Sequence, residues 1–348
     1  MDISKINIYD WQPSENMLCI NTIDAHTCGE PLRVIFNGFP KLRGDTILEK
    51  RRYAQENYNS IRRSLMWEPR GHADMYGCII TKAVSSEADF GVLFIHNEGF
   101  STMCGHGIIA VTTVMLECGF MSMESPEVKI KIDTPAGMVT AYARVKNNKV
   151  ESVYFHNVPS FVYQLNKEVV LEGIGKIKYD IAFGGAFYAI INAEEVGIQL
   201  IPENNKQIIN LGMKIKKAII AETEFQHPFE DELNYLYGTI FIGPPHSTRA
   251  DGRNVCIFAE GELDRSPTGT GVSARLALHH AKSEIKKSES MVIESIIGST
   301  FRGSIKEVTK FGEYNAVITE VEGSAYITGR NEFFIDPNDP LKNGFILR

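Results

Sequence analysis

The 348-residue chain has no long apolar run. No stretch approaches the roughly 20 consecutive apolar residues that a transmembrane helix needs. The first eleven residues, MDISKINIYDW, contain no apolar segment of the kind found in export signals. These absences argue against a membrane-spanning or exported protein and predict a cytoplasmic one.

Basic residues are fewer than acidic ones. The chain has 36 Lys and Arg against 43 Asp and Glu, which gives a net charge of −7. The densest basic stretch, residues 50–63, is interrupted by acidic and polar residues, as on a solvated helix face. A nucleic-acid-binding surface is therefore not expected.

The six cysteines form no recognisable framework. They lie at positions 19, 28, 78, 104, 118 and 256, mostly inside apolar runs. His26 and Cys28 have the spacing of two metal ligands, but no second pair accompanies them, so a polar turn is the preferred interpretation. No GxGxxG motif follows an early strand. We expect free thiols in a reducing compartment, no metal site and no nicotinamide site.

One stretch carries a distinctive pattern. Residues 91–116 read GVLFIHNEGFSTMCGHGIIAVTTVML, with an apolar strand, a polar turn and then Cys104 followed by Gly-His-Gly and an apolar helix. The first N–H groups of a helix lack internal partners and carry a positive field. A carboxylate can bind there, and the same field lowers the pKa of a thiol. Cys104 is thus a candidate general base.

The pattern occurs a second time. Residues 254–278 read NVCIFAEGELDRSPTGTGVSARLAL, and residues 268–271 (TGTG) align with residues 104–107 (CGHG). Glu260 corresponds to Glu98, and both glutamates are interpreted as turn formers. Such internal similarity suggests two related halves. If the two helices meet at their N-termini, they create one anion site with Cys104 on one side and Thr268 on the other.

The remaining segments favour a mixture of strands and helices. A strand–turn–strand unit is expected at 16–36 and a helix at 45–66, with a further helical region at 194–217. Strands are expected at 77–82, 128–132, 138–145, 151–156, 181–193, 218–223 and 236–242, and short strands over 281–348. His72 and Asp74, on an irregular segment, fit acid–base chemistry and structural hydrogen bonding equally well.

The sequence resembles the proline racemase family, which shares its fold with diaminopimelate epimerase. The matching segments cover most of the chain: 24–31 (DAHTCGEP), 69–75 (PRGHADM), 103–107 (MCGHG), 264–271 (DRSPTGTG) and 337–341 (PNDPL).

The resemblance implies an α+β fold of two pseudo-symmetric halves. Each half would be a curved sheet around a central helix, with the active site between the two helix N-termini. We expect an N-terminal half over residues 1–158, to which residues 330–348 return, and a C-terminal half over 159–329. A homodimer is also implied.

In that family, two thiols act on opposite faces of the substrate α-carbon. Here the first is Cys104, but Thr268 occupies the second position, and a hydroxyl is a far weaker acid than a thiol. This Cys/Thr pairing resembles the family's trans-3-hydroxy-L-proline dehydratase branch. The resemblance further implies that Asp264 binds the ring ammonium and that Tyr76 and Phe258 contact the pyrrolidine ring.

The stereochemistry of that substrate suits a single thiol. The α-hydrogen and the 3-hydroxyl share one ring face, so their loss is a syn elimination. We expect the Cys104 thiolate to take the α-proton, and Cys104 or His106 to protonate the hydroxyl. The amides of Gly105, His106, Gly269 and Thr270 would hold the carboxylate and the enolate-like charge. The product would be Δ1-pyrroline-2-carboxylate, formed without metal, pyridoxal phosphate or nicotinamide.

Three alternatives remain open from the sequence. The nearest is a proline racemase or hydroxyproline 2-epimerase with Thr268 or a water as a poor second acid. Another is a hydrolase or acyltransferase that uses Cys104 as a nucleophile with a distant histidine. The third is a non-catalytic amino-acid-binding protein.

Overall fold

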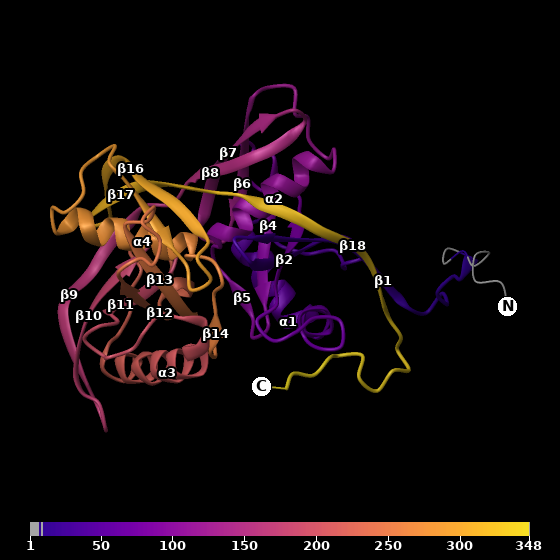
Figure 1. The fold of residues 1–348 in the computed structure, drawn as a ribbon. Helices are drawn as coiled ribbons and strands as arrows, with labels where there is room; N and C mark the ends of the chain where they lie inside the picture. Colours follow the sequence, from indigo (N-terminus) through magenta and orange to yellow (C-terminus); the bar gives the residue numbers. More distant parts are fainter. Residues whose placement is uncertain (1–6, 8–9, 348) are drawn as a thin grey trace.

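The computed structural model describes residue 7 and residues 10–347, and these form two lobes with mixed helices and strands (Figure 1). Within these residues, eighteen strands are connected by pairing into one sheet, and four α-helices pack against it. The fold is therefore α+β, as expected.

The first lobe contains the N-terminal part of the chain. Its elements are β1 (Leu18–Thr27), β2 (Glu30–Asn37), α1 (Ile47–Met66), β3 (Tyr76–Thr81), β4 (Phe90–His96), β5 (Phe100–Ser101), α2 (Gly105–Glu117), β6 (Glu127–Thr134), β7 (Gly137–Lys146) and β8 (Lys149–His156). The last strand, β18 (Ala325–Ile335), returns to this lobe and pairs antiparallel with β1 along its whole length.

The second lobe contains the rest of the chain. Its elements are β9 (Ser160–Leu171), β10 (Gly175–Phe183), β11 (Phe187–Asn192), α3 (Asn205–Glu222), β12 (Leu236–Gly243), β13 (Gly252–Phe258), β14 (Glu262–Leu263), α4 (Gly269–Ala281), β15 (Ser290–Glu294), β16 (Thr300–Phe311) and β17 (Tyr314–Gly323).

The two lobes share an order of elements. Strands β2 and β3 are parallel with α1 between them in the chain, and β11 and β12 are parallel with α3 between them. Likewise α2 lies in the chain between the parallel strands β4 and β6, and α4 between the parallel strands β13 and β15. The Cys104 and Thr268 segments therefore occupy equivalent places in the two lobes.

Strand β17 joins the lobes. It pairs antiparallel with β8 of the first lobe, where Val321 lies opposite Phe155. Nearer its start it pairs with β9, where Val317 lies opposite Ser160. The sheet is thus continuous from one lobe to the other.

Helices α2 and α4 are the buried helices of their lobes. Every residue from 105 to 116 in α2 is buried, and so is every residue from 269 to 278 in α4. A helix that is apolar on all sides must be covered on all sides. Strands β1, β2, β7, β8, β17 and β18 pack around α2. Strands β9, β10, β16 and β17, among others, pack around α4.

Several segments differ from the predictions. Residues 181–193 were expected to form one strand, but they form the end of β10, a turn at residues 184–186 and β11. The turn brings the chain so close to α4 that a Cβ on Gly184 would lie 2.1 Å from the Thr270 carbonyl oxygen. Packing against the helix thus requires a glycine there, which divides the apolar run.

Residues 218–223 were expected to form a strand, but residues 218–222 are the last turn of α3. Their β-branched isoleucines favour a strand locally. Ile208, Leu211, Ile215 and Ile219 are buried along one face of the helix, and this helical spacing decides the structure. Near the C-terminus, β16 and β17 form a hairpin of strands 12 and 10 residues long, longer than the short strands expected.

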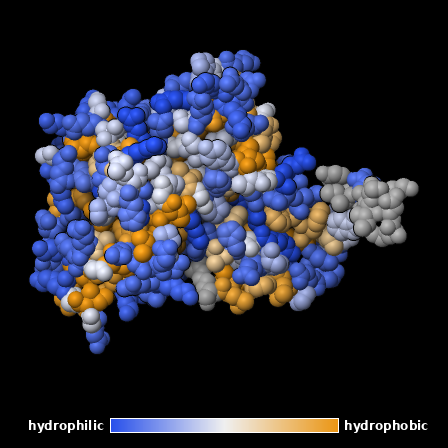
Figure 2. Space-filling view, viewed as in Figure 1, coloured by the Kyte–Doolittle hydropathy of each residue, from blue (hydrophilic) through white to orange (hydrophobic). Residues whose placement is uncertain are grey.

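The surface seen in Figure 2 is mostly hydrophilic, with apolar patches separated from one another. None of the helices among the described residues combines the length and apolarity needed to cross a bilayer. All six cysteines are free thiols. Most of the first eleven residues, on which the expectation of no export signal rests, lie outside the described part of the chain.

Candidate active site

The N-termini of α2 and α4 meet at two glycines. A Cβ on Gly105 would lie 2.6 Å from the Gly269 Cα, and a Cβ on Gly269 would lie 2.7 Å from the Gly105 Cα. Neither position can therefore carry a side chain without a shift of the backbone. The contact brings the free amides of two helix ends to one place, which is the arrangement expected for an anion site.

Cys104 is the N-cap residue of α2. Its sulfur accepts a hydrogen bond from the Gly107 amide at 3.2 Å, and it lies 3.2 Å from Nδ1 of His106. The cysteine is 5% exposed. The sulfur is thus held at the helix end with an imidazole beside it.

The pKa of Cys104 departs from the prediction. The helix field alone predicts a lowered value, but burial raises the pKa of the thiol well above its usual range. The Gly107 amide and the Tyr76 hydroxyl oppose this effect by hydrogen bonding to the sulfur. Desolvation in the closed site therefore outweighs the helix end, and the thiolate depends on these donors.

Thr268 occupies the equivalent position on α4, with a different geometry. Its φ is +65°, and its side chain makes no capping hydrogen bond. Instead the hydroxyl donates to Oδ2 of Asp264 at 2.7 Å, while Oδ1 of Asp264 accepts from the Ser266 amide at 2.7 Å. The Thr268 proton is therefore directed toward a carboxylate.

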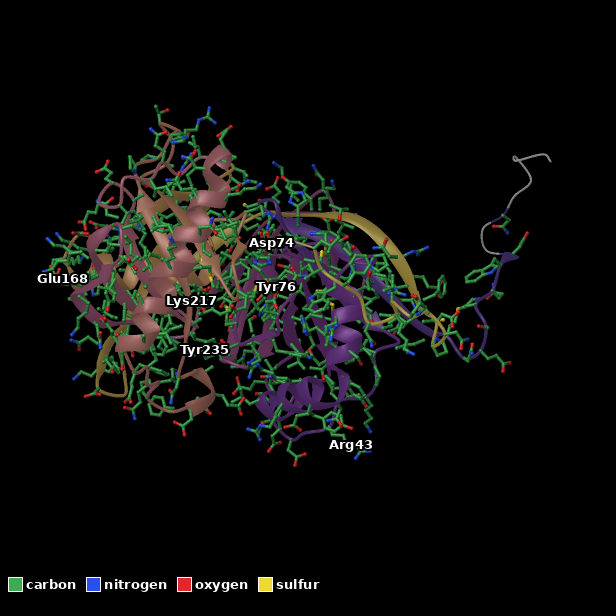
Figure 3. All side chains as sticks on the ribbon, turned by 90° about the horizontal axis from the view of Figure 1, so that it is seen from below. Arg43, Asp74, Tyr76, Glu168, Lys217 and Tyr235 are labelled. Carbon is green, nitrogen blue, oxygen red and sulfur yellow. The ribbon has the colours of Figure 1, made fainter. Side chains whose placement is uncertain are left out.

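The predicted site residues line one small cavity. Its volume is about 20 Å³, room for about one water molecule. All nine predicted site residues line it: Tyr76, Cys104, Gly105, His106, Phe258, Asp264, Thr268, Gly269 and Thr270. Cys104 and Thr268 thus face a common space between the lobes, and Figure 3 shows Tyr76 in this region.

Aromatic rings form much of the cavity wall. The ring of Tyr76 meets that of His106 edge-on at 4.8 Å between centroids, and that of Phe258 at 6.1 Å. Burial lowers the pKa of His106, so the imidazole is neutral near pH 7. The wall is therefore apolar apart from a few directed polar groups.

Three residues of the cavity were not among the predicted site residues: Met103, Tyr188 and Tyr237. The Tyr188 hydroxyl is hydrogen-bonded to Oγ1 of Thr270 at 2.7 Å, and Tyr237 stacks on Phe258 at 5.4 Å. Both tyrosines lie in or beside apolar strand segments that resemble ordinary core strands. Only Met103, next to Cys104, had a signal in the sequence.

Other polar candidates lie outside the cavity. Asp74 forms an ion pair with Arg265 at 2.9 Å, and Nδ1 of His72 is hydrogen-bonded to the Ala73 carbonyl. Nδ1 of His26 accepts from the Gly29 amide at 3.2 Å. Within the described residues there is no group of three or more His, Cys, Asp or Glu side chains placed to hold a metal. These contacts are structural, and none of the three residues lines the cavity between the helix ends.

Glu30 lies behind the cavity and is fully buried. Its Oε2 accepts from the Arg265 amide at 2.7 Å, while Oε1 has no partner among the described residues. Burial, together with the negative charge of Asp264, raises the pKa of Glu30 well above its usual value. The side chain therefore stays protonated to a higher pH than an exposed glutamate does.

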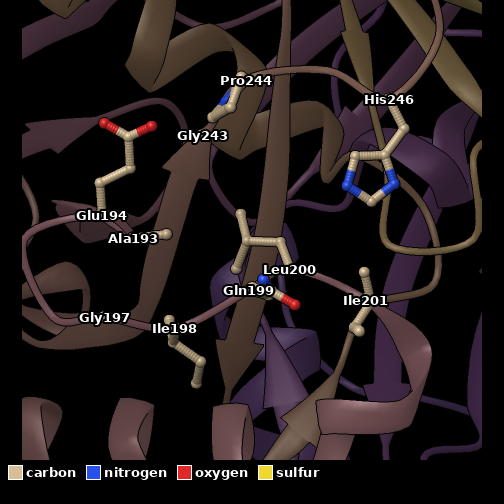
Figure 4. Close-up of a pocket in the computed structure, with 10 residues that line it drawn as sticks. All are labelled: Ala193, Glu194, Gly197, Ile198, Gln199, Leu200, Ile201, Gly243, Pro244 and His246. Atoms are coloured by element: carbon tan, nitrogen blue, oxygen red, sulfur yellow. The ribbon is translucent and has the colours of Figure 1, made fainter.

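A larger pocket lies elsewhere. It has a volume of about 660 Å³ and lies at the carboxyl ends of β11 and β12, where Glu194 and His246 stand on opposite sides (Figure 4). None of the nine predicted site residues lines it. The predicted site residues line the small cavity between the helix ends instead.

Comparison with known proteins agrees with this geometry. A family model described as proline racemase matches residues 22–346. A trans-3-hydroxy-L-proline dehydratase from Colwellia psychrerythraea is 49% identical over 99% of this chain and 98% of its own. A proline racemase from Clostridioides difficile is 42% identical over 94% of this chain and 98% of its own.

Solved structures with a similar fold include a hydroxyproline epimerase. A hydroxyproline epimerase from Agrobacterium vitis, with bound trans-4-hydroxy-L-proline, superimposes with a TM-score of 0.91 at 30% identity, covering 96% of each chain. With a matching family model and relatives of this similarity over nearly the full length, the chain belongs to the proline racemase family.

Proposed function

We propose that this protein is a trans-3-hydroxy-L-proline dehydratase, a hydro-lyase that forms Δ1-pyrroline-2-carboxylate. The observation that carries the proposal is the asymmetry of the cavity, which has a thiol at one helix end and a hydroxyl at the other. A relative 49% identical over 346 residues bears the dehydratase name, and this similarity supports the proposal.

The Cys104 thiolate would remove the α-proton. The amides of Gly105, His106, Gly269 and Thr270 would hold the carboxylate and stabilise the negative charge that develops as the proton leaves. Two helix ends at one point supply the necessary field. After elimination the enamine tautomerises to the cyclic imine.

The residues beside the N-terminus of α4 would bind the substrate rather than react with it. Asp264 would hold the ring ammonium, since it is buried at 3% exposure and faces the cavity. Thr268 would orient Asp264 through its hydrogen bond. Because its proton is directed at that carboxylate and its acidity is low, Thr268 cannot serve as the second acid–base group. Tyr76 and Phe258 would contact the ring.

A proline racemase or hydroxyproline 2-epimerase is the second candidate, because a relative 42% identical bears the racemase name. It needs an acid–base group on each face of the α-carbon. Polarimetry with L-proline and with trans-4-hydroxy-L-proline distinguishes it, since a dehydratase of this design leaves both substrates optically unchanged.

We also infer the organisation of the chain. The two halves would be pseudo-symmetric, each a curved sheet around its central helix. Residues 1–158 with 330–348 would form the half that carries Cys104, and residues 159–329 the half that carries Thr268. The repeated order of elements supports this division. A cytoplasmic homodimer without cofactor is the expected form, and light scattering tests the assembly.

The decisive assay incubates the protein, dialysed against a chelator, with trans-3-hydroxy-L-proline. The cyclic imine is trapped with o-aminobenzaldehyde and measured by its absorbance. Product formation without added metal or cofactor is expected. Absence of imine, with racemisation of proline instead, would contradict the proposal.

A further inference from the structure

A chain of buried hydroxyl groups ends at the catalytic sulfur. The Tyr76 hydroxyl is hydrogen-bonded to the Ser101 hydroxyl, and both residues are 2% exposed. The same phenol oxygen is in hydrogen-bonding contact with Tyr237 and with the Cys104 thiol. Tyr76, Tyr237 and Cys104 all line the cavity between the helix ends.

The donor in the contact between Tyr76 and Cys104 follows from the chemistry of the thiolate. A thiolate has no proton and can only accept a hydrogen bond. When Cys104 is ionised, the Tyr76 hydroxyl is therefore the donor, and its hydrogen bond lowers the pKa of Cys104. The proton of Tyr76 is then directed at the sulfur.

The other groups around the sulfur are poor proton donors. The Gly107 amide donates a hydrogen bond but cannot lose its proton. Burial lowers the pKa of His106, so its ring is neutral. Nδ1 of this ring lies 3.2 Å from the sulfur, but the N–H of a neutral imidazole is a far weaker acid than a phenol. This leaves Tyr76 as the side chain that can deliver a proton at Cys104.

We propose that Tyr76 is the general acid that protonates the 3-hydroxyl as it leaves. This inference rests on the proposed dehydratase function. The α-hydrogen and the hydroxyl share one ring face, so the acid must stand on the same wall as the base. Tyr76 meets this requirement through its contact with Cys104.

The proton balance closes without a further reactant. The Cys104 thiolate takes the α-proton and becomes a thiol. The electron pair left at Cα forms the Cα–C3 double bond while the C3–O bond breaks. The leaving oxygen takes the Tyr76 proton and departs as water. The Tyr76 oxygen then takes the proton of the Cys104 thiol, which restores both groups.

The test replaces the hydroxyl and keeps the ring. In Tyr76→Phe, dehydration should fall by about 10²-fold or more, as for loss of a general acid. Proton abstraction by Cys104 should continue, so the substrate exchanges its α-hydrogen in D₂O. Mass spectrometry of recovered substrate and imine trapping give the ratio of exchange to dehydration. We expect this ratio to rise.

Tyr188→Phe is the matched control. It also removes one hydroxyl from a fully buried tyrosine of the cavity, but that hydroxyl is bonded to Thr270 on the opposite wall. Its ratio of exchange to dehydration should stay at the wild-type value even if its rate falls. A wild-type ratio in Tyr76→Phe would overturn the role of Tyr76.

A second measurement uses a leaving group that needs no acid. With trans-3-fluoro-L-proline, Tyr76→Phe should retain much more of its wild-type rate than with the hydroxyl substrate. Equal losses on both substrates would contradict the proposal. Failure of the dehydratase function itself is distinguishable, because wild-type protein would then form no imine from trans-3-hydroxy-L-proline.

Discussion

At the scale of single residues, the two helix ends differ in the reactive atom that each presents, and the proposed chemistry depends on this difference. Cys104 offers sulfur and Thr268 offers oxygen, although both residues precede a Gly-X-Gly helix start. The sulfur receives an amide and a phenol hydrogen bond, whereas the hydroxyl gives its proton to Asp264. In the proposed mechanism, Cys104 and its neighbours transfer protons, and Thr268 and Asp264 bind the substrate.

Cys104→Ser tests the first wall. Serine keeps the cap but loses the acidity of the thiol, so imine formation should fall by at least about 10²-fold. Cys118→Ser, at the other end of the same helix, is the control and should retain activity, because Cys118 lies away from the cavity. A near-wild-type rate in Cys104→Ser would reject the mechanism.

Thr268→Cys tests the second wall. A thiol there would supply a base on the opposite face of Cα, so slow epimerisation of a proline derivative should appear in the presence of reductant. Polarimetry or chiral chromatography measures it. Thr268→Ser keeps the hydroxyl and should show none. If the cysteine variant also shows none with any proline derivative, the opposed-face geometry is incorrect.

Glu30 gives a prediction on stability and pH. Its pKa is ordinarily about 4.5 and is raised in the folded state by burial. Below pH 4.5 both states are protonated and there is no penalty. As pH rises above 4.5, the unfolded state ionises while the folded state stays protonated, so folding loses stability until the raised pKa is passed.

Glu30→Gln removes this titration. Thermal melting between pH 4.5 and 8 should therefore show the melting temperature of the variant rising relative to wild type as pH increases. A difference that does not change with pH would show that Glu30 ionises with its ordinary pKa in the folded protein.

Much of the site was predictable from sequence because its residues lie in short local motifs. Cys104 and Thr268 precede Gly-X-Gly at a helix start, and both line the cavity. Tyr188 and Tyr237 were missed because each reaches the cavity from a strand segment with no motif. The raised pKa of Cys104 was missed because desolvation depends on how the two lobes pack together.

At the scale of elements, α2 and α4 are arranged by contact at their first residues. Gly105 and Gly269 meet so closely that their backbones touch. Both helices were predictable because their starts are marked by glycines and the residues that follow are mostly apolar. Residues 218–223 were mispredicted because burial at helical spacing over the whole of α3 overrides the local preference of its isoleucines.

Gly269→Ala tests the contact of the helix ends. The added Cβ would lie 2.7 Å from the Gly105 Cα and force the helices apart. We expect a loss of about 1–3 kcal/mol in the free energy of unfolding, together with a loss of activity. Denaturant unfolding and the imine assay measure the two effects.

Gly99→Ala is the control, since an added Cβ there meets nothing within 4 Å and the backbone has no positive φ. It should leave both stability and activity close to wild type. If Gly269→Ala behaves like Gly99→Ala, the helix ends are not in rigid contact.

At the scale of the whole molecule, the chain crosses between lobes more than once. After β17 it leaves the second lobe, and β18 pairs with β1 from Leu18↔Ile335 to Thr27↔Ala325. Strand β1 therefore has partners on both sides, β2 and β18. The return of the C-terminus to the first lobe was predicted from the family resemblance alone. Nothing in the local sequence of residues 325–335 shows which strand they pair with.

Truncation after Gly323 tests this return. It leaves one edge of β1 unpaired, and an exposed strand edge favours aggregation. We expect a protein that is less soluble and has no cooperative melting transition. Size-exclusion chromatography and circular dichroism measure this. Removal of residues 346–348 alone spares β18 and the bridge of Glu68 with Phe345, and should be tolerated.

The small volume of the cavity has a kinetic consequence. A space of about 20 Å³ has room for one water molecule and not for a hydroxyproline, so we expect the walls of the cavity to move apart when substrate binds and product leaves. Such motions take microseconds to milliseconds and often limit turnover in enzymes. Because strands β8, β9 and β17 connect the lobes, we expect flexing of these strands to limit the rate of product release. Steady-state turnover should then depend on solvent viscosity, whereas the bond-breaking steps should not.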